Sequence, residues 1–270
     1  MSRQLSRSSA LQAGAAAVLV VGVMLLLIVS GHNRDDADDN ADDGDRSSDV
    51  TESQELAGGF VTIPSDAFFA TVTAAQKAAG SWRVVSVSEI DGKASPASTQ
   101  DVVDANGDPA IRIQIQSTKG PVIGVYVGGR FYVHGLTAAP TPWWKVPTSP
   151  AIEDLLVFAD PEQFLSGIKD PRSFEVIGVE KVESGNAVHY KIGVDAETAD
   201  ENGEQNGTQP VQLDLWVDNE NRPVQAISTF TVEGHKQTST LVYSDYGQDL
   251  EIAAPPADQV TTKAPQGAGL

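Results

Sequence analysis

Strict alternation of apolar and polar residues is the feature that most constrains the fold of this chain. Ile111, Ile113 and Ile115 alternate with arginine and glutamine. Two further segments repeat the pattern and place on one face Val188, Tyr190, Ile192 and Val194, and Leu213, Leu215 and Val217. A period of two is that of a β-strand with one apolar and one polar face. The pattern therefore predicts a protein built from half-buried strands.

Weaker strands are predicted between short turns. The turns include Gly128-Gly129 and Ser184-Gly185-Asn186, whose residues suit tight hairpins. Because short turns join antiparallel neighbours, we expect one long antiparallel sheet of nine or ten strands. The weaker strands are residues 82–90, 121–127, 131–134, 174–182, 224–232, 238–243 and 250–252, and residues 196–209 are predicted to form a loop.

Few helices accompany these strands. Ser65 can cap a helix that ends at Gly80, with one apolar face formed by Phe68, Val72, Ala75 and Ala79. A second short helix is predicted over residues 161–168. The fold class is therefore mainly β (α+β), with one domain over residues 61–262 and a disordered tail over residues 263–270.

A sheet of this size has an apolar face that must be covered. Two modest helices are little cover for that many strands. The sheet can curl around itself and leave part of this face lining a cavity, or it can close on a filled sandwich core. The alternation alone leaves both open.

The N-terminal segment predicts export. Residues 1–10 carry Arg3 and Arg7 and no acid, and residues 11–30 are almost wholly apolar. The apolar run of residues 11–29 spans about 28 Å as a helix, close to the thickness of a hydrocarbon core. We expect residues 1–10 to be cytoplasmic and residues 11–30 to form a single-pass transmembrane anchor, with the bulk of the chain extracytoplasmic. The alternative is a cleaved signal peptide. The aspartate-rich residues 31–60 are predicted to be a disordered tether.

Charge and composition exclude several classes of function. The net charge is −19, and residues 60–262 alone hold 13 basic and 27 acidic residues. Such a surface repels phosphate backbones, so we expect no nucleic-acid partner. The chain has no cysteine, which excludes disulfides, thiolate chemistry, zinc–thiolate sites and thiol acylation.

Catalytic motifs are absent from the sequence. None of the four histidines pairs with another histidine or a carboxylate at metal-ligand spacing, and we expect each to lie on the surface. Asp214 and Asp218, four residues apart on one strand, are about 13 Å apart, too far for a hydrolytic pair. We expect no enzyme activity, no cofactor and no metal.

Two stretches carry a resemblance to a known family. They are Leu215-Trp216-Val217-Asp218 followed by Arg222-Pro223-Val224, and Tyr243-Ser244-Asp245-Tyr246-Gly247 followed by Ala254-Pro255-Pro256. With the strand order, they resemble the LppX and LprG type of exported lipoproteins, related in fold to the carriers LolA and LolB. The resemblance covers about residues 63–260. It implies a strongly bent antiparallel half-barrel sheet with a few helices over its concave face, preceded here by the N-terminal transmembrane helix.

The resemblance also implies a function. Members of the family hold acyl chains between sheet and helices, so it implies a lipid-binding or lipid-transfer protein whose partner is a lipid or acylated ligand. We expect the cavity to be lined by Ile111, Ile113, Ile115, Val188, Tyr190, Ile192, Val194, Leu213, Leu215 and Val217. Where the family has its lipidated cysteine this chain has His32, so attachment to the cell membrane rests on residues 11–30. The alternatives are a protein-binding or sensory ectodomain that partners an envelope regulator, and a structural envelope protein with a filled core.

Trp143, Trp144 and Lys145 are predicted to lie at the mouth of the cavity. Neighbouring prolines disfavour a central strand for this segment. Adjacent residues of an extended segment point to opposite sides, so at most one tryptophan can face the interior. The other would contact a lipid or a partner, or both would cover the edge of the sheet.

Overall fold

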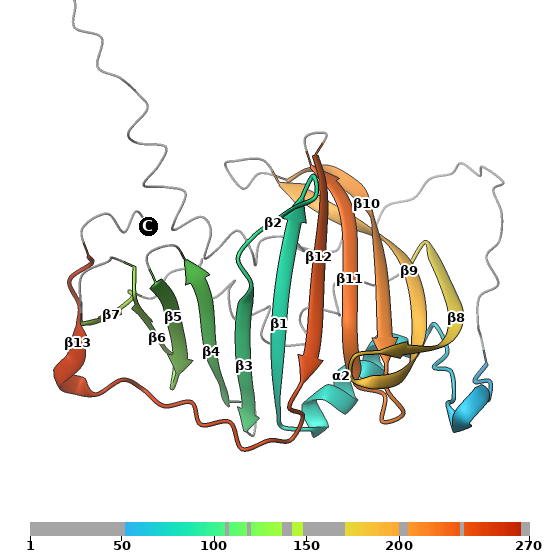
Figure 1. Cartoon of the computed structure of the whole chain (residues 1–270), viewed down its shortest axis with the longest axis horizontal. Helices are drawn as coiled ribbons and strands as arrows, with labels where there is room; N and C mark the ends of the chain where they lie inside the picture. The colour runs from blue at the N-terminus through green and yellow to red at the C-terminus, as the bar shows by residue number, and fades with distance from the viewer. Residues whose placement is uncertain are drawn as a thin grey trace, which may run out of the picture.

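The computed structural model describes residues 52–105, 108–117, 120–136, 142–147, 171–199, 205–232 and 235–265. These residues form one 13-stranded sheet, drawn in Figure 1. Its strand order is β13-β7-β6-β5-β4-β3-β1-β12-β11-β10-β9-β8, with β2 paired to β1. All neighbours are antiparallel except β13 and β7. The predicted long antiparallel sheet is confirmed, but it has 13 strands where nine or ten were expected.

The element bounds are as follows. The strands are β1 (Ser81–Ile90), β2 (Lys93–Ala94), β3 (Ser98–Ala105), β4 (Asp108–Ser117), β5 (Gly120–Val127), β6 (Arg130–His134), β7 (Trp143–Lys145), β8 (Ser173–Val182), β9 (Gly185–Ala199), β10 (Gln205–Val217), β11 (Pro223–Val232), β12 (His235–Ser244) and β13 (Val260–Thr261). The helices are α2 (Phe68–Ala78) and the 3-10 turns η2 (Ala57–Gly59) and η3 (Ala257–Gln259).

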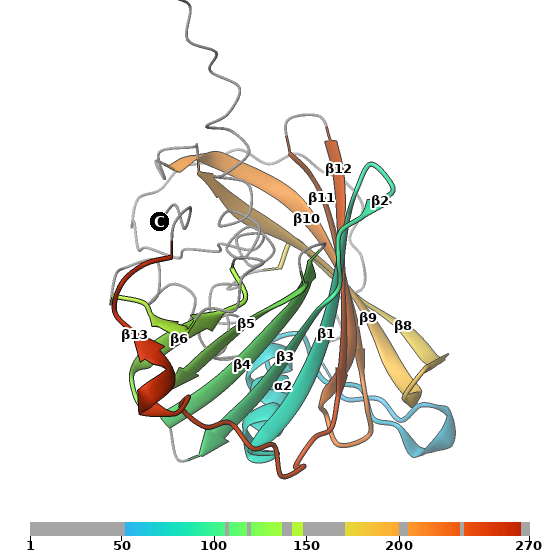
Figure 2. The ribbon, with the colours of Figure 1, turned by 60° about the vertical axis from the view of Figure 1, so that its left-hand side comes forward.

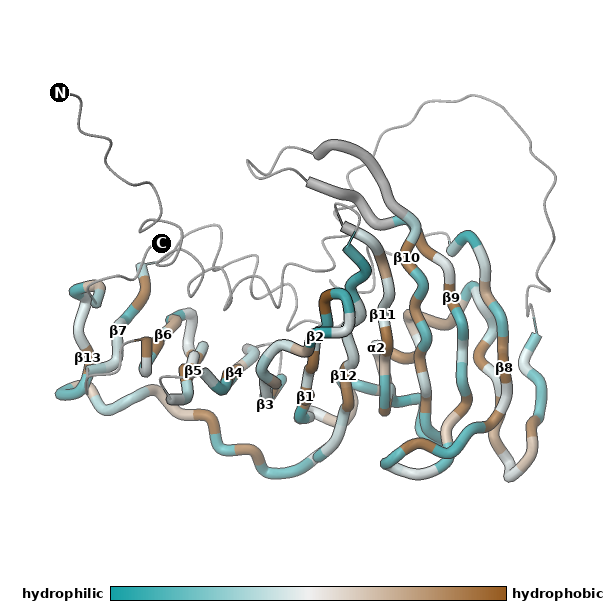
Figure 3. The backbone as a smooth tube through the Cα atoms, turned by 45° about the horizontal axis from the view of Figure 1, so that its top comes forward, coloured by the Kyte–Doolittle hydropathy of each residue, from teal (hydrophilic) through white to brown (hydrophobic). Residues whose placement is uncertain are grey.

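The sheet is strongly curved and open, and α2 lies on the inner side of the curve, as Figure 2 shows. Apolar and polar residues alternate along β9 and β10 in Figure 3. The cross-strand register keeps their apolar sets on one face, because Leu215 pairs with Tyr190 and with Ala226. We call the face toward α2 the concave face and the other the convex face.

Several strand predictions were wrong. The short strands β2, β7 and β13 were not predicted, and β7 pairs with both β6 and β13 although neighbouring prolines disfavour a central strand there. β3 was not predicted, because Ser98, Gln100 and Asp104 interrupt the apolar positions of its concave face. Residues 250–252 form no strand. The predicted loop over residues 196–209 is wrong at both ends, because β9 runs to Ala199 and β10 begins at Gln205, where ladder pairing outweighs the polar composition.

The helix α2 occupies the predicted segment, but its first residue differs. Ala67 is at the N-cap and no side chain caps the helix, so the prediction that Ser65 caps it was wrong. Gly80 follows the helix with φ +73°, a left-handed conformation that suits the predicted stop. Phe68 and Val72 are buried as predicted.

Residues 54–62, which include the last part of the predicted tether, belong to the folded part of the chain. Glu55 bridges Val61, and the Leu56 amide donates to the Phe60 carbonyl at 2.7 Å. Leu56 and Phe60 pack against the domain. Most of the predicted tether, the predicted membrane helix (residues 11–30) and the predicted helix over residues 161–168 lie outside the described residues. Among the helices of the described part, none has the length and apolarity to cross a bilayer.

Candidate functional site

All ten residues predicted to line a cavity are buried on the concave face. None is more than 8 % exposed. They divide between two separate clusters of buried side chains. Val188, Tyr190, Ile192, Val194, Leu213, Leu215 and Val217 belong to the first, and Ile111, Ile113 and Ile115 to the second.

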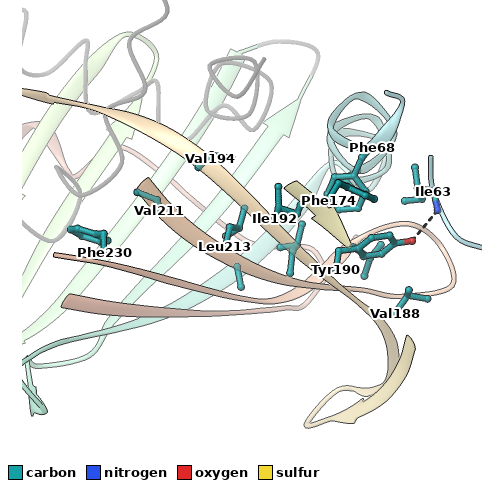
Figure 4. Packing of buried hydrophobic residues seen from close by; sticks show 14 residues of the cluster. Ile63, Phe68, Phe174, Val188, Tyr190, Ile192, Val194, Val211, Leu213 and Phe230 are labelled. Carbon is teal, nitrogen blue, oxygen red and sulfur yellow. Dashed lines mark hydrogen bonds between the residues drawn. The ribbon is translucent and has the colours of Figure 1, made fainter. Parts of the chain in front are cut away.

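The first cluster, which we call the helix cluster, lies between α2 and strands β8–β12 (Figure 4). Phe68 of α2 is fully buried, and its ring centroid lies 5.1 Å from that of Phe174 and 4.6 Å from that of Tyr190. The Tyr190 hydroxyl accepts a hydrogen bond from the Ile63 amide at 2.9 Å. Burial raises the pKa of Tyr190, so its phenol stays neutral. This half of the concave face is a packed aromatic core.

The second cluster, which we call the sheet cluster, lies on strands β1 and β3–β7. Its buried members are Trp82, Val102, Ile111, Ile113, Ile115, Phe131, Val133, Trp144 and Val146. No residue of a described helix belongs to it. The same alternation of apolar and polar residues therefore produces two different clusters. The helix α2 packs on the first, and no described helix packs on the second.

The tryptophan pair is split as predicted. Trp144 is 5 % exposed and belongs to the sheet cluster, whereas Trp143 faces the convex side and stacks on His134, with ring centroids 5.1 Å apart. Both form the short strand β7, with Lys145 paired to Tyr132. The predicted position at a cavity mouth remains a prediction.

Tyr243 joins the two clusters. Its ring, on the concave face of β12, packs against both. Burial raises its pKa to about 12. Tyr246 packs beside it, and its hydroxyl donates to the Pro223 carbonyl at 2.6 Å.

The residues that carry the family resemblance meet at one end of β10–β12. Asp218 accepts hydrogen bonds from the Glu220 and Arg222 amides and pairs with the Arg222 guanidinium at 2.8 Å. The same guanidinium lies over the Tyr246 ring, 5.0 Å from its centroid. These motif residues therefore stabilise a turn.

A polar cluster on the convex face was missed by the sequence reading. His189 Nε2 lies 2.9 Å from Asp214 Oδ1, and His189 Nδ1 lies 3.2 Å from Glu180 Oε2. Trp216 stacks on the imidazole, and its indole donates to Glu180 at 2.8 Å. His189 is thus not the isolated surface residue that we expected, because its partners come from neighbouring strands.

A second histidine also has a carboxylate partner. His235 Nδ1 lies 2.6 Å from Asp91 Oδ2, and this contact lowers the pKa of Asp91. No group of three or more metal-ligating side chains in the described residues is arranged to hold a metal. His189 lies on the convex face, and the His235 side chain is 64 % exposed at the start of β12.

Comparisons with known proteins find a shared fold. No family model and no curated protein matches the chain. The crystal structure of LprF from Mycobacterium bovis matches with a TM-score of 0.52 at 13 % identity, covering 70 % of this chain and 96 % of LprF. The two proteins share a fold. The Mycobacterium tuberculosis lipoprotein LppX matches at 15 % identity and a TM-score of 0.46, covering 70 % of this chain and 100 % of LppX. The resemblance inferred from the sequence is confirmed at the level of the fold.

Proposed function

We propose that this protein binds a lipid or acylated ligand on the concave face of its sheet and performs no reaction. One observation carries the proposal: nine apolar side chains gather on the concave face in the sheet cluster, and no residue of a described helix belongs to it. The fold shared with LprF supports it, since the family that the sequence resembles holds acyl chains at this face. Acyl burial against it would contribute about 0.8 kcal/mol per methylene.

We also propose that the protein acts at the cell membrane. Residues 11–30 would hold the domain at the outer face of the cell membrane, with the aspartate-rich segment as a spacer. Carbonate extraction of membranes, followed by N-terminal sequencing of the protein, tests this. Retention with residues 11–30 intact supports the anchor, and a soluble form that begins after residue 30 contradicts it.

Photolabelling of the full chain tests ligand binding. A fatty acid of about sixteen carbons with a diazirine in its tail is added to membranes that contain the protein, and labelled peptides are mapped by mass spectrometry. We expect labels on β4 and β6. A filled core predicts no label there, and equal labelling of both sheet faces would also contradict the proposal.

A matched pair of variants on one strand sharpens the test. Ile113 is 4 % exposed in the sheet cluster, whereas its neighbour Gln114 faces the convex side. Ile113→Lys places a charge on the proposed surface and is expected to abolish labelling of β4, whereas Gln114→Lys leaves it unchanged. Thermal melts of both variants establish that they are folded.

A further inference from the structure

Three serines form a row across the concave face. Ser88 of β1 pairs with Ser239 of β12, and Ser239 pairs with Ser228 of β11. Residues directly opposite on antiparallel strands have Cβ atoms about 5 Å apart, so the three hydroxymethyl groups lie side by side. Ser88 and Ser228 are each 4 % exposed.

One hydroxyl of the row has hydrogen-bonding capacity that the described residues do not use. The Ser88 hydroxyl is buried and has no hydrogen-bond partner among the described residues. The neighbouring pair Ser86 and Ser98 differs, because their hydroxyls bond each other at 2.6 Å. A buried hydroxyl without a partner costs about 1–3 kcal/mol, which a ligand that bonds to it would recover.

The described sheet positions that flank the row are uncharged. The concave-face positions that flank it on β1, β12 and β11 are Ser86, Ile90, Leu241, Gln237, Ala226 and Phe230. A phosphate or carboxylate would find no cation at these positions. Esters and hydroxyl groups need only donors and acceptors, which serine supplies.

Apolar surface lies on both sides of the row. Ser228 is followed across the sheet by Leu213, Ile192 and Phe174 of the helix cluster. Toward the other edge, the pair Ser86 and Ser98 leads to Ile115 of the sheet cluster. A ligand lying across the face would therefore meet polar groups in its middle and apolar groups at its ends.

We propose that the row of Ser88, Ser239 and Ser228 binds the uncharged polar group, an ester or hydroxyl, of a ligand whose alkyl chains extend over the two clusters. This inference rests on the proposed function and deepens it. It assigns the ligand a neutral polar centre with apolar arms.

Three probes test the assignment on the full chain in detergent. Dioleoylglycerol has ester and hydroxyl groups between its acyl chains, 1-hexadecylpyrene has no hydrogen-bonding group, and dioleoylphosphatidic acid adds a charge. Pyrene fluorescence measures the binding of 1-hexadecylpyrene. The affinities of dioleoylglycerol and dioleoylphosphatidic acid are measured from their displacement of bound 1-hexadecylpyrene. We expect wild-type protein to bind dioleoylglycerol more tightly than the phosphatidic acid.

The double variant Ser88→Ala/Ser228→Ala should weaken dioleoylglycerol binding about tenfold, because two hydrogen bonds are lost. Binding of 1-hexadecylpyrene should stay within about twofold. The control is Thr229→Ala, next to Ser228 but on the convex face, which should change neither affinity. If the double variant is unfolded, Ser88→Ala alone is compared with the same control.

The outcomes separate the two proposals. If wild-type protein binds none of the probes, the proposed function is wrong. If it binds 1-hexadecylpyrene but the serine variants leave dioleoylglycerol affinity unchanged, or weaken both probes equally, only the serine assignment is wrong. Tighter binding of the phosphatidic acid than of dioleoylglycerol would overturn the uncharged centre.

Discussion

The two halves of the concave face have the same origin in sequence and different structures. The helix cluster is packed by Phe68 of α2, which is fully buried among aromatic rings. The sheet cluster consists of strand residues and Val146, without a described helix. Alternation therefore specifies which residues face inward but not what covers them. The two halves should respond differently to truncation.

The largest effect is expected at the centre of the helix cluster. Phe68→Ala should lower the free energy of unfolding by about 3–5 kcal/mol, because a fully buried ring leaves a cavity. Urea denaturation measures it. Phe69→Ala, at a partly buried neighbour, is the control and should cost less. Equal costs would mean that α2 is not packed as described.

The matching change in the sheet cluster is Ile113→Ala. We expect a loss of about 2 kcal/mol, the low end for such truncations, because no described helix fixes the surroundings and they can relax. Gln114→Ala on the opposite face should stay within about 0.5 kcal/mol. A loss as large as that of Phe68→Ala in the same urea titration would remove the distinction between the two halves.

Tyr190→Phe probes a buried hydrogen bond that ties residues 54–63 to the helix cluster. The Ile63 amide would lose its acceptor, at a cost of about 1–3 kcal/mol. Hydrogen exchange of the Ile63 amide should accelerate along with the loss in stability. Unchanged exchange would show that another acceptor replaces the hydroxyl.

Tyr243 tests whether the ring that joins the two clusters is buried as the structure shows. Its folded pKa, raised by burial from an ordinary value of 10.0 to about 12, favours the neutral phenol. The resulting stability is fully present below pH 10 and is lost as the pH rises toward 12. Chemical denaturation at pH 9 and pH 11 should show a drop that Tyr243→Phe reduces. An identical drop in the variant would assign it to other groups.

The smallest effect is expected on the convex face. The hydrogen bond from Trp216 and the contact with His189 hold the pKa of Glu180 below its ordinary value of 4.5. Its stabilisation is present above pH 4.5 and is lost as the pH falls through the lowered folded pKa. Because the Glu180 side chain is 43 % exposed, Glu180→Gln should cost well under 1 kcal/mol at pH 7, and the cost should shrink as the pH falls below 4.5. A large loss at pH 7 in denaturant titrations would mean that the cluster is structurally essential.

The strands with clean alternation could be predicted from sequence, and the polar ones could not. β4, β9 and β10 were predicted from their alternating isoleucine, valine and leucine residues. β3 was missed because its inward positions include Ser98 and Gln100. The proposed serine site was missed for the same reason. In the sequence, a polar residue on the concave face of a strand cannot be told from a polar residue in a loop, because only alternating apolar residues mark a strand.

The sequence by itself determined the fold class and which side chains of the alternating strands face inward, because the period of a strand is a local property of the backbone. Tertiary structure alone decided which strands became neighbours. It placed Ser88, Ser239 and Ser228 in one row, put Asp214 and Glu180 beside His189, and divided one apolar set into two clusters. The physical reason is that strands pair through backbone hydrogen bonds, which are the same for every residue type. The side chains of Ser88 and Ser239, more than a hundred positions apart in the sequence, therefore give no sign that the two residues are neighbours.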